Sequence, residues 1–120
     1  MEKPHRILIV EDEPLIGMML QDYMEIIGHD VAGVVDCVEA ALAALRRERV
    51  DLVVLDVNLG NGERCDPVAE ALLRDGIPFI LSSGDPHVPE ALGGRPILPK
   101  PYTLADVERA LGSLQLSQAA

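Results

Sequence analysis

Short apolar runs alternate with amphipathic segments along the whole 120-residue chain. Five runs are rich in Val, Ile and Leu and have the length of buried strands, namely 7–10, 31–35, 52–55, 77–81 and 96–99. Four other segments place apolar residues on one face of a helix, namely 14–27, 37–47, 66–74 and 103–114. This alternation predicts a doubly wound α/β fold, with a parallel sheet covered by helices on both faces.

The segment 85–95 interrupts this pattern, because it holds two prolines and two glycines. We expect only a shortened or irregular fourth helix there. Pro96 and Pro99 flank the fifth run, and prolines are tolerated in a sheet only at its edge. We therefore expect the flavodoxin-like strand order 2-1-3-4-5, in one domain spanning residues 1–120 with no linker, repeat or output domain.

Composition and charge argue against several classes of function. The chain is 48% hydrophobic, which is ordinary for a globular fold with a core. Its net charge of −10 argues against a general nucleic-acid binder. Three aromatic residues, Tyr23, Phe79 and Tyr102, are too few for a base-stacking platform. Cys37 and Cys65 lack metal-site spacing and are typical of free thiols in a reducing compartment. No apolar run approaches a membrane span, so we expect a cytoplasmic protein without a membrane partner.

Polar residues follow four of the five apolar runs. They are Glu11, Asp12, Glu13, Asp56, Ser82, Ser83 and Lys100. In the expected strand order the carboxyl ends of these strands are neighbours, so the side chains converge on one pocket. Adjacent residues of a strand face opposite ways, so only one of the two serines points into it. Glu13 is expected to face the first helix instead.

The predicted pocket suits a metal ion and a phosphoryl group. Clustered carboxylates repel one another unless a cation lies among them, and Mg²⁺ prefers oxygen ligands. An ammonium group and a hydroxyl opposite the metal would hold phosphoryl oxygens. Asp56 then becomes the natural nucleophile for an aspartyl phosphate. Each residue also has a simpler interpretation: a turn-initiating acid at Asp56, helix caps at Glu11 and Asp12, and a surface lysine at Lys100.

Four segments at these strand ends, 7–14, 53–58, 83–84 and 100–102, resemble the CheY-like receiver domain of two-component response regulators. The resemblance extends over nearly the whole chain. It implies that Asp56 is the phosphoacceptor, and that Ser83 and Lys100 contact the phosphoryl group. It further implies that Mg²⁺ is held by Glu11, Asp12, Asp56 and the backbone carbonyl of Asn58.

The resemblance also implies partners. A histidine kinase or histidine phosphotransfer protein would donate the phosphoryl group, and a downstream protein or a second copy of the chain would receive the signal. Such a module is a switch with self-catalysed phosphotransfer and dephosphorylation rather than an enzyme with turnover. Two features depart from the family. Ile97 replaces the usual Tyr or Phe of the fifth strand, and the Pro- and Gly-rich segment 85–95 stands where the family has the helix after the fourth strand.

Two other classes of function remain open. The first is a receiver-like protein-binding module that never uses phosphate, and the departure at Ile97 favours it. The second is an aspartate-nucleophile phosphatase or other hydrolase. Such enzymes commonly carry a second acid two residues after the nucleophile, where this chain has Asn58.

Overall fold

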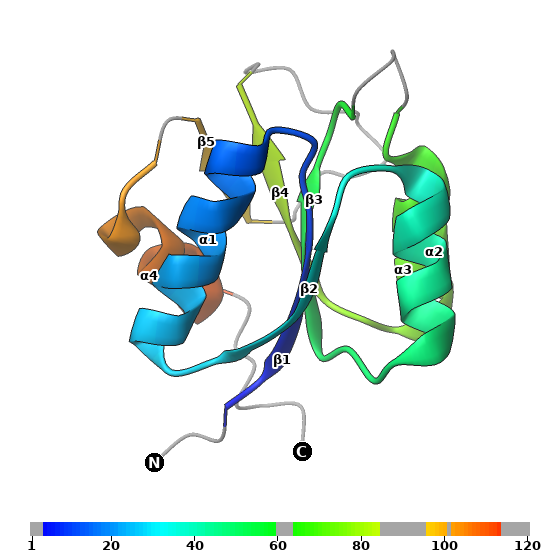
Figure 1. The fold of residues 1–120 in the computed structure, drawn as a ribbon, viewed down its shortest axis with the longest axis horizontal. Coiled ribbons are helices and arrows are strands. Elements are labelled where there is room, and N and C mark those ends of the chain that lie inside the picture. The colour runs from blue at the N-terminus through cyan, green and yellow to red at the C-terminus, as the bar shows by residue number, and fades with distance from the viewer. Residues whose placement is uncertain (1–3, 60–63, 85–95, 101, 114–120) are drawn as a thin grey trace.

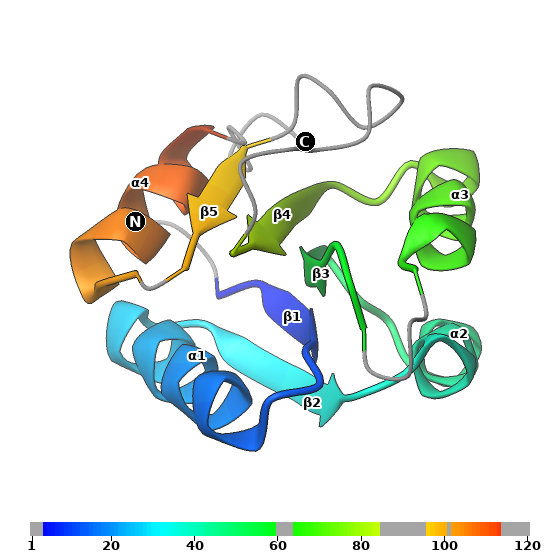
Figure 2. The same ribbon diagram turned by 90° about the horizontal axis from the view of Figure 1, so that it is seen from above.

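The computed structural model describes residues 4–59, 64–84, 96–100 and 102–113, which form a five-stranded parallel sheet between two layers of helices (Figure 1). The strands are β1 (Arg6–Val10), β2 (Asp30–Val35), β3 (Leu52–Asp56), β4 (Phe79–Ser83) and β5 (Ile97–Pro99). The helices are α1 (Pro14–Ile27), α2 (Val38–Arg47), α3 (Asp66–Asp75) and α4 (Leu104–Ser113). The strand order β2-β1-β3-β4-β5, visible in Figure 2, confirms the predicted sheet.

Helices α1 and α4 cover one face of the sheet, and α2 and α3 cover the other (Figures 1 and 2). Side chains alternate between these faces along each strand. Ile7 and Ile9 of β1 therefore pack in the layer of α1 and α4, whereas Leu8 and Val10 pack in the layer of α2 and α3. All five residues of the central strand β3 are buried, as expected where helices cover both faces of a parallel strand.

Helix ends follow local sequence signals. Gly28 ends α1 with a φ of 112°, a left-handed conformation that glycine adopts without steric cost. Before α4, the Thr103 N–H donates to Asp106 Oδ2 (2.8 Å) and the Asp106 N–H donates to Thr103 Oγ1 (3.3 Å). This reciprocal pair is a capping box, with Thr103 as the capping residue and α4 beginning at Leu104.

The bounds of the fourth strand differ from the sequence-based prediction. The fourth strand was placed at 77–81, but β4 runs from Phe79 to Ser83. Pro78 has no N–H to donate to a ladder, while the carbonyls of Ser82 and Ser83 accept hydrogen bonds from the N–H groups of Val57 and Lys100, both at 3.0 Å. The irregular helix expected at 85–95 lies outside the described residues. Within the described part of the chain, no helix is long and apolar enough to cross a membrane.

Candidate functional site

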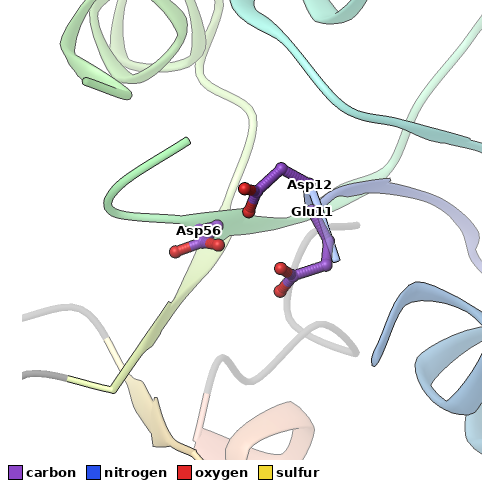
Figure 3. A group of neighbouring side chains, drawn as sticks. All are labelled: Glu11, Asp12 and Asp56. Carbon is purple, nitrogen blue, oxygen red and sulfur yellow. The ribbon is translucent and has the colours of Figure 1, made fainter. Parts of the chain in front are cut away.

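Three acidic side chains converge at the carboxyl ends of β1 and β3 (Figure 3). Glu11 and Asp12 follow β1 directly, and Asp56 is the last residue of β3. One carboxylate oxygen from each lies within 4.8 Å of the others. Glu11 and Asp56 are only 3% and 4% exposed, and Asp12 is half-buried. The parallel pairing of β1 with β3 places these residues side by side, as the strand-end argument predicted.

Lys100 reaches the same pocket from the end of β5. Its Nζ lies 3.1 Å from Glu11 Oε1 and 3.1 Å from Asp56 Oδ2. The other oxygen of Asp56, Oδ1, accepts a hydrogen bond from the Asn58 N–H at 3.2 Å. Asp56 is thus held at both oxygens, one by an ammonium group and one by the backbone of the following loop. These two contacts fix the orientation of the Asp56 carboxylate.

Burial and charge strongly perturb these groups. Burial, together with the negative charge of Asp56, raises the pKa of Glu11 to about 7, and the hydrogen bond from Lys100 partly opposes this rise. Burial also raises the pKa of Asp56, although Glu11, Lys100 and the Asn58 N–H favour its ionised form. Burial disfavours the ammonium form of Lys100, but hydrogen bonds to Glu11 and Asp56 outweigh this and raise its pKa.

This donor set fits Mg²⁺. Glu11 and Asp56 share one ammonium group, so ionising both leaves a net negative charge in a buried pocket, to which Asp12 adds. A divalent cation relieves that repulsion, and all the available ligand atoms are oxygens. Asn58, which was expected to contribute its carbonyl, is exposed and follows Asp56 by two residues.

The structure also places the remaining predicted residues. Ser83 is buried at the end of β4, and its carbonyl accepts the hydrogen bond from the Lys100 N–H. Glu13 was expected to face away, but its Oε1 lies 3.5 Å from Lys100 Nζ, although the side chain is 60% exposed. The run of three acids after β1 shows that Glu13 is near the site in sequence, but it does not show which way the side chain points. Tyr102 is a buried member of the hydrophobic core on the α1 and α4 side of the sheet.

Comparison with known proteins agrees with this geometry. The model of the response regulator receiver domain matches residues 7–110. The chain belongs to the response regulator receiver family. This receiver is 45% identical to SdrG from Sphingomonas melonis Fr1, whose solution structure superposes with a TM-score of 0.87 over 95% of this chain and 98% of that one.

Other similar proteins are PhyR regulators. The receiver domain of PhyR from Erythrobacter litoralis is 30% identical, with a TM-score of 0.83 over 98% of this chain and 94% of that one. The phyllosphere-induced regulator PhyR of Methylorubrum extorquens is 34% identical over 88% of this chain, but this chain covers only 41% of its length. The receiver likewise spans about half the length of TcrX from Mycobacterium tuberculosis, at 29% identity.

Proposed function

We propose that this receiver is a phosphoacceptor switch, which takes a phosphoryl group from a phosphohistidine onto Asp56. The donor is a histidine kinase or a histidine phosphotransfer protein. The observation that supports this best is the position of Asp56. Its carboxylate is buried between the Lys100 ammonium, at 3.1 Å, and the acidic groups Glu11 and Asp12. This arrangement places a nucleophile between a fixed cation and a site suited to a second cation.

The transfer is a substitution at phosphorus. A carboxylate oxygen of Asp56 forms the new P–O bond, the P–N bond to the donor imidazole breaks, and the imidazole nitrogen keeps the electron pair. Glu11, Asp12, Asp56 and the Asn58 carbonyl would hold Mg²⁺, which would supply positive charge to neutralise the phosphoryl oxygens. Lys100 supplies a second positive charge from the β5 side, and the Ser83 hydroxyl is the proposed hydrogen-bond donor.

Removal of the phosphoryl group resets the switch. Water, or the imidazole of an acceptor histidine, attacks phosphorus, and the Asp56 carboxylate leaves. The acyl phosphate replaces one carboxylate by a larger anion and so biases the loops around the pocket. Its readout is a change in contacts with a downstream protein or a second copy of the receiver, in the cytoplasm. A BeF₃-activated conformation of SdrG, 45% identical to this chain, supports the idea that this fold responds to such an anion.

Intact mass after incubation with acetyl phosphate tests this function. We expect wild type to gain one phosphoryl group in the presence of Mg²⁺ and none after chelation, and Asp56→Asn to gain none. Asp22→Asn, at an exposed position of α1, is the matched control and should behave as wild type. An equal mass gain in Asp56→Asn would refute the site. No gain in wild type, together with no Mg²⁺ binding, would favour the phosphorylation-independent binding module instead.

A further inference from the structure

Two buried hydroxyl groups lie beside the acidic pocket. Ser82 is 1% exposed and Tyr102 is 4% exposed. Among the described residues, neither Ser82 Oγ nor the Tyr102 hydroxyl has a hydrogen-bond partner. Burial raises the pKa of Tyr102, and the neighbouring Ser82 hydroxyl partly opposes this, so the two groups are close although no hydrogen bond of normal geometry joins them. Buried hydroxyls are nearly always paired, because leaving one unpaired is costly.

Ser82 adjoins the acidic cluster through the sheet, and Tyr102 adjoins α4 along the chain. Ser82 is the direct partner of Asp56 in the pairing of β3 with β4. Tyr102 follows Lys100 by two residues and precedes the first residue of α4 by two. Its side chain packs in the same layer as Val107 and Leu111 of α4. Tyr102 therefore belongs to the short stretch of sequence that joins Lys100 to α4.

We propose that Tyr102, next to Ser82, is the positioning residue that couples the phosphoryl state of Asp56 to α4. This inference rests on the proposed function. A phosphoryl group on Asp56 offers oxygens beyond the carboxylate, and Lys100, now shared by Glu11 and Asp56, moves toward them. Tyr102 moves with the chain, and its hydroxyl, which has no hydrogen-bond partner among the described residues, gains one.

The energetic consequence has a definite sign. An unpaired buried hydroxyl destabilises the unmodified state relative to any state in which that hydroxyl is paired. Tyr102→Phe removes this difference and so makes the activated state harder to reach. Ser82→Ala acts in the same direction, because it removes the second unpaired hydroxyl. Both variants should weaken binding of beryllofluoride, a mimic of the acyl phosphate, by on the order of tenfold.

Tyrosine emission provides a direct readout, because Tyr23 and Tyr102 are the only tyrosines and the chain has no Trp. Tyr23→Phe leaves Tyr102 as the sole emitter and deletes the same atom from the same layer of the fold. We expect its emission to change along a saturable titration with beryllofluoride and Mg²⁺, with an affinity within about twofold of wild type. In Tyr102→Phe, the emission of Tyr23 should stay constant, while calorimetry shows the weaker binding.

The outcomes separate the two proposals. If wild type gains the phosphoryl mass but Tyr102 emission is unchanged, or if Tyr102→Phe and Ser82→Ala bind beryllofluoride as tightly as Tyr23→Phe, the coupling role is refuted and the phosphoacceptor function stands. If wild type neither gains the mass nor binds beryllofluoride, the proposed function and the coupling role are both refuted. Circular dichroism of each variant establishes that it is folded, and Ser82→Ala tests the coupling independently of any packing change at Tyr102.

Discussion

The stability of the metal-free receiver should fall as the pH rises from about 5 to about 8, and Mg²⁺ should reverse the loss. The pKa of Glu11 is raised from 4.5 to about 7 in the folded chain, because the carboxyl group is buried and faces Asp56. Between these two values the folded state holds a proton that the unfolded state releases, so the free energy of unfolding declines with pH. Each pH unit corresponds to about 1.4 kcal/mol, which gives a loss of about 3 kcal/mol at most. Asp56, whose pKa is also raised, contributes with the same sign.

Thermal unfolding followed by circular dichroism measures this effect. A loss of this size lowers the midpoint by on the order of 10 °C in a domain of this length. Because Mg²⁺ binds the ionised carboxylates, its stabilisation should be larger at about pH 8 than at about pH 5. Glu11→Gln should flatten the pH profile of the metal-free protein, whereas Glu70→Gln, at an exposed position of α3, should not. If Glu11→Gln keeps the wild-type slope, or if Mg²⁺ stabilises wild type equally at both pH values, the argument from the buried carboxylates is wrong.

Three further changes test the packing and the charge balance. Lys100→Met leaves Glu11 and Asp56 without the ammonium group that they share, so the free energy of unfolding of the metal-free protein should fall by about 3 kcal/mol in chemical denaturation. Saturating Mg²⁺ should recover part of this loss. Gly17→Ala puts a methyl group 2.8 Å from Val34 Cγ1, which should lower the free energy of unfolding by about 1–3 kcal/mol. This loss should largely disappear in a Val34→Ala background. If the effects of the two substitutions simply add, the clash is contradicted. Leu72→Ala empties a fully buried position of α3 and should cost about 2–5 kcal/mol, while a loss below about 1 kcal/mol would mean that the layer repacks around the gap.

Periodicity predicted most of the fold, because the elements differ clearly in their apolar spacing. The fully buried strand β3 is a continuous apolar run, and Pro14 and Gly28 mark the start and the end of α1. The start of β4 was misplaced because Ile77 is apolar but lies before Pro78, and the ladder forms only from Phe79 onward. Strand ends depend on which carbonyls find donors on neighbouring strands, and local sequence carries little of that information.

The strand order alone predicts which residues of the candidate site lie near one another. Residues that directly follow neighbouring parallel strands share an edge, so Glu11, Asp12 and Asp56 were predicted to meet, and they do. Burial and pairing of individual atoms were not predictable, because they depend on side chains that reach across the sheet. The contact of Glu13 with Lys100 belongs to this class.

The hydroxyl of Tyr102 is the clearest example of an atom whose burial and pairing could not be predicted from the sequence. By sequence it is an aromatic residue after a lysine and a proline, which is typical of simple packing. In the structure its hydroxyl is buried close to Ser82 and has no hydrogen-bond partner among the described residues, and Tyr102 precedes the first residue of α4 by two. Ile97 of β5 is 48% exposed and has no polar group, so it cannot report an anion through a hydrogen bond. Tyr102 has a hydroxyl group and follows Lys100 by two residues, which is why we propose this residue, and not Ile97, as the link between Asp56 and α4.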